Sequence, residues 1–280
     1  MSKLVIRITE GASQPFFSIV VPTYARPLQL AACLEALAQL DYPRERFEVI
    51  VVNDGGPSEH TEMLARADHL NLKTISQPHA GPAAARNAGA ALANGDLLAF
   101  TDDDCMPASD WLNRLAERFA VHPDHAIGGQ TITALPLNPY SAVSQSLVAC
   151  LYHCYYGETA PAPLRSSRAT RFFTANNLSL PAESFHALGG FDRRFTMPAA
   201  EDRDLCDRWL QQGLELTHAP EAKVYHAHRL SLLTFWQQQI NYGRGAFRFH
   251  QLRAQRRRAP IRLESWRFYA NMLRCAMTVP

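Results

Sequence analysis

The sequence predicts an α/β fold in which a mostly parallel sheet is flanked by helices. In the first part of the chain, short apolar segments alternate with helix-like segments about every 25 residues, as in βαβ units. These apolar segments are continuous, which indicates strands that are buried on both faces. Polar residues directly follow three of them. In a parallel sheet such residues meet beyond the carboxyl ends of the strands, where ligands bind.

Four strands are expected in this part of the chain, and turn signals mark their ends. Pro22 ends the first strand, and Asn53-Asp54-Gly55 ends the second. Asn94-Gly95 precedes the fourth strand, and three aspartates follow it. The strands are predicted at residues 17–21, 47–52, 72–76 and 97–101.

Three helices are expected between these strands. Residues 30–40 carry apolar side chains at helical spacing, and Ser58 can cap a second helix. Gly81-Pro82 opens an alanine-rich helix that runs to Asn94, with proline in its favoured early position.

The second half of the chain is less regular. Gly189-Gly190 ends a predicted helix at 182–188, and Gly213 ends another at 200–212. Strands are expected at 126–133, 172–180 and 224–226. Further helical segments are expected within 136–163 and at 232–249 and 265–277.

Charge is distributed unevenly along the chain. The net charge is +2, but residues 229–280 carry ten arginines and one acid, a net charge of +9, and the remainder carries −7. Such a basic extension can be a solvated helix surface, or it can contact an anionic membrane or a phosphate-bearing ligand. Nucleic acid is disfavoured because the body is acidic and no recognition module is evident.

Cysteine usage and hydropathy indicate a cytoplasmic protein. No apolar run is long enough to span a membrane, and residues 1–10 have no apolar secretory core. The six cysteines form no CxxC pair, so we expect reduced thiols. Cys150, His153 and Cys154 could form a zinc site, but the tyrosines around them fit a buried helix better.

Asp102, Asp103 and Asp104 directly follow the fourth strand. Adjacent carboxylates repel one another, and burial raises the pKa of a carboxyl group unless a positive group compensates. A divalent cation with oxygen ligands is the simplest such group, so we expect a metal site. The alternative is a loop of solvated acids that caps the helix starting near Ser109.

Other residues near the strand ends suit a nucleotide. Pro22 and Tyr24 can form an apolar wall for the base, and Asp54 can accept a hydrogen bond from a ring N–H. Gly55 and Gly56 permit close backbone approach. The alternative for Asp54-Gly55-Gly56 is an ordinary turn.

Two later segments carry groups that can move protons or bind anions. Glu201 and Asp202 begin a helix and offer a carboxylate that can deprotonate a nucleophile, although acids are also common at helix starts. His226 and His228 lie two apart on a predicted strand and therefore share a face. Either can bind a metal or a phosphate, or can be structural.

In this order and spacing, the motifs resemble the family 2 glycosyltransferases with the GT-A fold, over roughly residues 17–249. The resemblance is carried by Ile19-Val20-Val21-Pro22-Thr23-Tyr24, Val51-Val52-Asn53-Asp54-Gly55, Gly81-Pro82-Ala83-Ala84-Ala85-Arg86-Asn87-Ala88-Gly89, Phe100-Thr101-Asp102-Asp103-Asp104, Gly189-Gly190-Phe191-Asp192 and Glu201-Asp202-Arg203-Asp204-Leu205.

The resemblance implies a Rossmann-like GT-A domain at residues 1–228, followed by a basic helical extension at 229–280. Residues 15–105 would form the nucleotide-binding half, and residues 106–228 the acceptor-side half.

It also implies an inverting, metal-dependent enzyme. A single sugar would pass from a nucleotide diphosphate sugar, commonly a UDP-sugar, to an acceptor hydroxyl in the synthesis of a cell-surface glycan or glycolipid, with Mn²⁺ or Mg²⁺ bound. Asp202 matches the catalytic base, with Glu201 beside it. Asp104 matches the metal ligand of the DXD motif, and His226 the histidine near the diphosphate. The donor would be held by Pro22, Thr23, Tyr24, Arg26, Asp54, Arg86, Asp102 and Asp103.

Three alternatives bear on this interpretation. The QxxRW motif of processive members is absent, since the chain reads Gln239-Ile240-Asn241-Tyr242-Gly243-Arg244-Gly245, so single addition is favoured. A sugar-phosphate nucleotidyltransferase would have a glycine-rich loop where Thr23-Tyr24-Ala25-Arg26-Pro27 stands. A non-catalytic nucleotide-binding relative would not need the acidic residues.

The acceptor would be a glycan or a lipid-linked molecule, and the basic extension could dock on the inner face of the plasma membrane.

Overall fold

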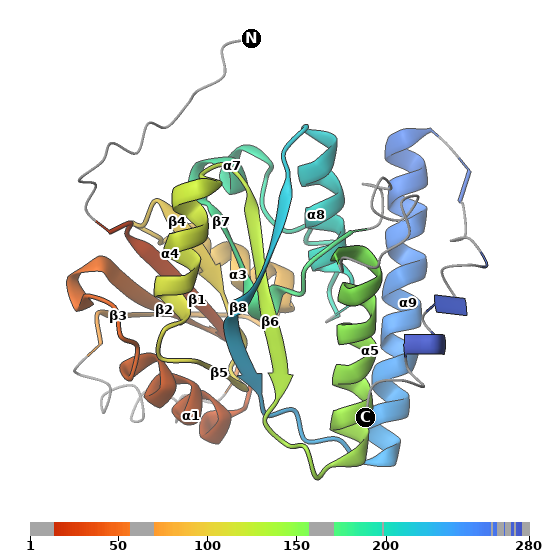
Figure 1. The fold of residues 1–280 in the computed structure, drawn as a ribbon, viewed down its shortest axis with the longest axis horizontal. Coiled ribbons are helices and arrows are strands. Elements are labelled where there is room, and N and C mark those ends of the chain that lie inside the picture. The colour runs from red at the N-terminus through yellow and green to blue at the C-terminus, as the bar shows by residue number, and fades with distance from the viewer. Residues whose placement is uncertain are drawn as a thin grey trace.

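The computed structural model describes residues 14–56, 70–156, 171–197, 199–258, 260–261, 266, 270–271 and 273–275. Its strands form one eight-stranded sheet in the order β3-β2-β1-β4-β7-β6-β8-β5, with helices on both faces (Figure 1). The helix predicted after Ser58 and most of the segment predicted at 265–277 lie outside the described residues.

The amino-terminal half of the sheet is parallel, as predicted. Its strands are β1 (Phe17–Thr23), β2 (Phe47–Asp54), β3 (Leu72–Gln77) and β4 (Leu97–Phe100), and each begins at the predicted residue. Ile19 and Val21 pack into the core on one face of the sheet, and Val20 packs into the core on the other. Burial on both faces explains the continuous apolar segments at 19–21 in β1, 49–52 in β2 and 97–100 in β4.

Helices cover both cores. One core lies under α1 (Pro27–Ala38) and α4 (Trp111–Val121), and the other lies under α3 (Pro82–Ala90) and α8 (Glu201–Gln211). The turn before α3 needs a glycine, because Gly81 has φ +88° and a Cβ there would meet the carbonyl of Thr196. A short 3₁₀ turn, η1 (Arg44–Arg46), precedes β2.

The second half of the sheet is mixed. β7 (Leu178–Pro181) is antiparallel to β4 and to β6 (Ala126–Thr133), and β8 (Leu216–His226) is parallel to β6. The strand predicted at 172–180 is wrong in its first part, because η3 (Ala175–Asn177) turns the backbone before β7. The strand predicted at 224–226 is the end of the longer β8.

A three-residue strand that the sequence did not predict forms one edge of the sheet. β5 (Cys105–Pro107) pairs antiparallel with β8, and Cys105 lies opposite His226. Three residues are too few to show a two-residue hydrophobic period. Four of the seven strand pairs are parallel, so the mostly parallel α/β fold is confirmed.

The remaining helices are α5 (Pro139–Tyr156), α7 (Ala182–Ala187) and α9 (Leu232–Arg257). α9 begins at the predicted residue, where Ser231 and Thr234 form a capping box, and continues past the predicted end at 249. It lies along α5 and α8 at the edge of the molecule (Figure 1). None of the described helices is both long and apolar enough to cross a bilayer.

The prediction that the cysteines are reduced thiols is wrong for one pair. Cys150 of α5 forms a disulfide with Cys275, and their Cα atoms are 5.7 Å apart, a normal spacing for such a bond. The two residues are 125 positions apart in the chain, so only the fold brings them together. Cys33, Cys105 and Cys206 are free and buried. The side chains of His153 and Cys154 lie outside the described residues.

Two glycines of α9 give a matched test of how this helix packs. A Cβ on Gly245 would lie 2.5 Å from the Cβ of Ala199, whereas a Cβ on Gly243 would meet nothing within 4 Å. We expect Gly245→Ala to lower the free energy of unfolding by about 1–2 kcal/mol through overpacking. Gly243→Ala should raise it by up to about 1 kcal/mol through helix propensity. Urea denaturation of both variants measures this, and equal effects would contradict the packing of α9 against Ala199.

Candidate active site

The carboxyl ends of β1, β2 and β4 meet at one edge of the sheet, as the sequence predicted. There the hydroxyl of Thr23 donates to Asp103 Oδ2 at 2.8 Å. Arg26 Nη1 lies 3.1 Å from Asp103 Oδ1 and 3.0 Å from Asp104 Oδ2. Burial raises the pKa of Asp103 to about 6, although Arg26 acts in the opposite direction. One half-exposed arginine therefore serves two adjacent carboxylates.

Asp104 also contacts two histidines, which the pairing of β5 with β8 brings close to it. His226 Nε2 lies 3.2 Å from Asp104 Oδ1, and His228 Nδ1 lies 3.3 Å from Asp104 Oδ2. Burial alone would raise the pKa of Asp104, but the hydrogen bonds from both histidines and the charge of Arg26 hold it well below its ordinary value. Burial alone would lower the pKa of His226, but the hydrogen bond to Asp104 and its charge raise it.

The donor set of these three residues fits a divalent transition metal. Asp104, His226 and His228 each offer one ligand atom, and these atoms lie within 4.8 Å of one another. A carboxylate with two imidazoles suits ions such as Mn²⁺ or Zn²⁺ better than Mg²⁺, which prefers oxygen ligands. The structure brings together the two predicted ligands, Asp104 and His226, and adds His228. We name this cluster the Asp-His-His cluster.

Arg86 connects the aspartates after β4 to the start of α8. Its side chain is buried, with Nη2 2.6 Å from Asp102 Oδ1 and Nη1 2.8 Å from Glu201 Oε1. The two carboxylates raise the pKa of Arg86 further above its ordinary value, against the effect of burial. Its Nε has no hydrogen-bond partner, and its guanidinium carbon lies 5.6 Å from the centre of the Phe191 ring. This one side chain therefore joins three segments that are distant in the sequence.

The adjacent acids Glu201 and Asp202 have different surroundings. Glu201 is buried, and its second oxygen accepts a hydrogen bond from the backbone N–H of Ala199 at 3.0 Å, so both of its oxygens have partners in the protein. Among the described residues, Asp202 accepts hydrogen bonds only from backbone N–H groups, at 3.2 Å from Ala175 and 2.7 Å from Arg203. Burial and the negative charge of Glu201 raise the pKa of Asp202 to about 7. Asp202 is therefore the acid suited to exchange a proton near neutral pH.

Asp54 lies at the end of β2, but its carboxylate faces the loop before α3. It accepts hydrogen bonds from the backbone N–H groups of Ala80 and Gly81 at 2.9 and 2.8 Å, and from the Gln77 side chain at 2.7 Å. These contacts join the end of β2 to the loop before α3 and do not decide between the predicted turn and a role toward a base, which stays a prediction. Beside them, the half-exposed Tyr24 ring stacks on His79 with 4.3 Å between centroids.

A polar cavity of about 60 Å³ adjoins the Asp-His-His cluster. It lies between β6, α5, η3, the end of β8 and α9. Ala175, whose N–H binds Asp202, lies between two residues that line it. The lining residues are Thr131, Thr133, Ser141, Ser144, Gln145, Val148, Thr174, Asn176, His226, His228, Leu230, Gln238 and Tyr242. The sequence gave no signal for most of them, because single hydroxyl and amide residues on separate elements form no motif.

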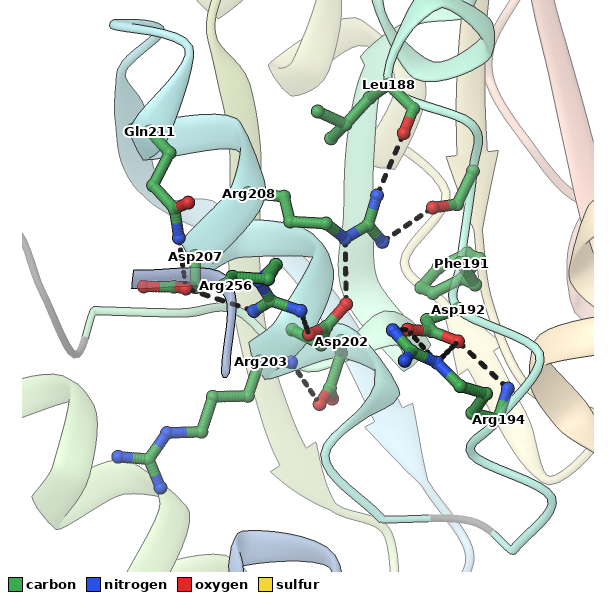
Figure 2. Close-up of polar contacts among 12 residues, drawn as sticks. Leu188, Phe191, Asp192, Arg194, Asp202, Arg203, Asp207, Arg208, Gln211 and Arg256 are labelled. Atoms are coloured by element: carbon green, nitrogen blue, oxygen red, sulfur yellow. Dashed lines mark hydrogen bonds and ion pairs between the residues drawn. The ribbon is translucent and has the colours of Figure 1, made fainter. Parts of the chain in front are cut away.

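Ion pairs fix α8, which carries Asp202 in its first turn. Arg208 donates to the carbonyl of Leu188 at 3.0 Å (Figure 2). It also donates to the carbonyl of Gly190 at 2.6 Å and pairs with Asp204. From α9, Arg256 pairs with Asp204 at 2.6 Å and with Asp207 at 3.2 Å. α9 therefore supplies positive charge that helps to hold the helix bearing Asp202.

Comparison with known proteins finds relatives of this chain. The family model described as glycosyl transferase family 2 matches residues 18–187, and one described as the N-terminal domain of galactosyltransferase matches residues 159–230. A pre-mycofactocin glycosyltransferase of Mycobacterium tuberculosis is 30% identical over 248 residues, which cover 86% of this chain and 48% of the relative. A validoxylamine A glucosyltransferase of Streptomyces hygroscopicus subsp. jinggangensis is 30% identical over 249 residues, which cover 78% of this chain and 59% of that relative. The chain thus spans about half the length of the curated relatives it matches.

Solved structures share the fold. The mannosyltransferase PcManGT from Pyrobaculum calidifontis, in complex with GDP-Man and Mn²⁺, aligns with a TM-score of 0.65 at 17% identity, covering 94% of this chain and 69% of that one. Staphylococcus aureus TarS 1–349, in complex with UDP-GlcNAc, aligns with a TM-score of 0.53 at 18% identity, covering 77% of this chain and 59% of that one. The predicted GT-A fold is confirmed by these neighbours.

The bridge made by Arg86 can be tested through stability. Arg86→Met leaves Asp102 and the buried Glu201 without their shared cation, and loss of one partner from such a pair destabilises a protein by about 3 kcal/mol or more. The control Arg114→Met removes an exposed arginine that pairs with Asp110 and Glu117, and should leave the free energy of unfolding unchanged. Urea denaturation compares the two. Equal stabilities would show that Arg86 does not hold these segments together.

Proposed function

The chain belongs to glycosyltransferase family 2, and from this premise we propose that it transfers a single sugar from a nucleotide diphosphate sugar to an acceptor hydroxyl, with inversion at the anomeric carbon. One observation carries the proposal: Asp202, a carboxyl group with a pKa of about 7, is hydrogen-bonded to Ala175, whose two neighbours in the chain line the same polar cavity as His226 and His228. Fold neighbours that hold GDP-Man or UDP-GlcNAc support a nucleotide-sugar donor.

The donor is proposed to lie across the carboxyl edge of the sheet. The stacked rings of Tyr24 and His79 offer a surface for the base, with Pro22 and Asp54 beside them on β1 and β2. Thr23, Asp102 and Asp103 face the ribose and diphosphate, and Arg86 fixes the orientation of Asp102. Arg26 is half-exposed and can turn from Asp103 and Asp104 toward the anionic diphosphate.

The residues of the Asp-His-His cluster would hold Mn²⁺, or Mg²⁺ with added water ligands. When bound, such an ion neutralises the negative charge that builds on the departing nucleotide diphosphate. Without a bound ion, the hydrogen bond to Asp104 and the charge of Asp104 raise the pKa of His226, and its protonated form would then add positive charge at this place. Neighbours in complex with Mn²⁺ support a divalent metal.

Asp202 is proposed to act as the base. Its carboxylate takes the proton of an acceptor hydroxyl, and the oxygen attacks the anomeric carbon from the side opposite the diphosphate. Glu201 does not take this part, because Arg86 and Ala199 occupy its oxygens. Instead, its charge raises the pKa of Asp202.

The acceptor is proposed to be a hydroxyl of a glycan or of a lipid-linked molecule. The polar side chains of the cavity suit a polyhydroxylated group, since Gln145, Asn176 and Gln238 can each donate and accept hydrogen bonds. The proposed division into a domain at 1–228 and an extension at 229–280 keeps the extension in contact with this cavity, because Gln238 and Tyr242 belong to α9.

Replacement of Asp202 should abolish transfer while leaving nucleotide binding intact. Asp202→Asn removes the base, and we expect the turnover rate to fall by about 10²–10⁴-fold. In the parent enzyme the rate should rise with pH through about 7, because the carboxyl group with the raised pKa is ionised only above that value. Asp192→Asn, which alters an acid that pairs with Arg194 away from the cavity, is the control. Near-parent rates for Asp202→Asn would remove its role as the base.

Metal binding can be measured without turnover. We expect Asp104→Asn and His228→Gln each to weaken Mn²⁺ binding at least about tenfold, with or without UDP or GDP, because each removes one ligand. The electron paramagnetic resonance signal of free Mn²⁺ gives the bound fraction. His122→Gln alters a partly buried histidine that is not part of the cluster and serves as the control. Unchanged affinity in the Asp104→Asn and His228→Gln variants would show that the metal does not bind at the cluster.

A further inference from the structure

One side of α9 exposes large apolar residues. Leu233, Trp236, Ile240 and Phe247 are 78%, 59%, 47% and 60% exposed. Their spacings of three, four and seven residues place them on one side of the helix. We call these four residues the α9 face. Leu137, which is 98% exposed, lies near its start, because Asn138 donates a hydrogen bond to the carbonyl of Leu230.

The opposite side of α9 packs against the protein. Gln238 and Tyr242 line the cavity, Gly245 contacts Ala199, and Phe249 is buried. The orientation of the helix is therefore fixed, and the α9 face cannot turn inward without losing these contacts. Exposed apolar groups gathered on one side of a helix mark a surface that binds something else.

Positive charge borders the α9 face. α9 carries five arginines and no acid. Three of them, Arg253, Arg256 and Arg257, pair with Asp204 and Asp207 of α8. The basic extension that the sequence offered for membrane contact is thus partly neutralised by ion pairs within the protein.

The other two arginines of the helix are free to meet an external anion. Arg244 and Arg248 are exposed and follow Ile240 at intervals of four residues, along one edge of the α9 face. Within the described part of the chain, no carboxylate pairs with either of them. Apolar and aromatic residues beside unpaired arginines are typical of helices that lie in a membrane interface.

We propose that the α9 face docks on the surface of an anionic phospholipid bilayer, with the helix lying in the plane of the headgroups. Trp236 and Phe247 insert among the headgroups, and Arg244 and Arg248 contact lipid phosphates. A second copy of the chain is a poorer occupant, because pairing two such faces would bring four unneutralised arginines together.

Docking in this way would place the cavity close to the membrane. The residues that line the cavity from α9 lie on the opposite side of the same helix, whose diameter with side chains is about 10–12 Å. An acceptor carried by a membrane lipid could therefore reach the cavity while its lipid stays in the bilayer. This last consequence rests on the proposed function, whereas the docking itself does not.

Sedimentation with vesicles tests the docking independently of any transfer. The parent protein should sediment with vesicles that contain phosphatidylglycerol, less with phosphatidylcholine alone, and less again as salt is raised. The double variant R244Q/R248Q should lower the partition coefficient on anionic vesicles about 30-fold. The double variant W236S/F247S should reduce binding to both kinds of vesicle to background.

Matched controls alter equivalent residues on other surfaces. L28S/V121S replaces two exposed apolar residues on α1 and α4, and R193Q/K223Q removes two exposed charges outside α9. Both should bind vesicles like the parent. Thermal denaturation with UDP or GDP checks that every variant is folded and binds nucleotide.

Three outcomes would overturn the proposal. In the first, the parent protein does not sediment with anionic vesicles. In the second, the control variants lose as much vesicle binding as the variants of the α9 face. In the third, the parent protein is a dimer that the substitutions W236S/F247S dissociate, and it does not bind vesicles. The last would assign the α9 face to a second copy of the chain. None of these outcomes depends on the chain being active, so a failure here is distinct from a failure of the proposed function.

Discussion

A single buried guanidinium holds the candidate active site together. Arg86 lies between Asp102, which follows β4, and Glu201, which begins α8. Without this cation, the acids brought together by the sheet edge and by α8 would repel one another in a poorly solvated place. Arg86 pairs with Glu201, and among the described residues the neighbouring Asp202 accepts hydrogen bonds from backbone N–H groups only. Burial and the charge of Glu201 raise the pKa of Asp202 to about 7, although Arg86 acts in the opposite direction. The two adjacent acids thus differ in their partners, which are an arginine for Glu201 and backbone N–H groups for Asp202.

The parallel half of the fold could be predicted from the sequence, because it depends on local signals. Continuous apolar segments and turn residues such as Asn53-Asp54-Gly55 located the start of each of its four strands correctly. The second half depends on long-range pairing, which leaves weaker local patterns. β5 is held by β8 from across the chain, and η3 interrupts a segment that looks extended in sequence. The disulfide of Cys150 with Cys275 has no local signal at all.

The candidate site, too, could be predicted only where its residues lie in local sequence motifs. Asp104, His226 and Asp202 were predicted because they lie in motifs at element ends, and Arg86 because it lies in a motif of the family. The structure brings these residues close to one cavity or to one ion-pair network. Their roles stay predictions. His228 was left open between several roles, and the pairing of β5 with β8 places it beside Asp104. The pairing of Arg256 and Arg257 with α8 was not predictable, because net charge says nothing about which charges are neutralised inside the fold.

If Asp202 activates the acceptor directly, the sugar is transferred in one displacement and its anomeric configuration inverts. Proton NMR of the first-formed product, recorded before mutarotation, reads that configuration from the coupling of the anomeric proton. Any nucleotide sugar that the protein turns over can be used, with an acceptor alcohol or with water. We expect a product whose configuration is opposite to that of the donor. A product that retains the configuration of the donor would contradict a single displacement with Asp202 as the base.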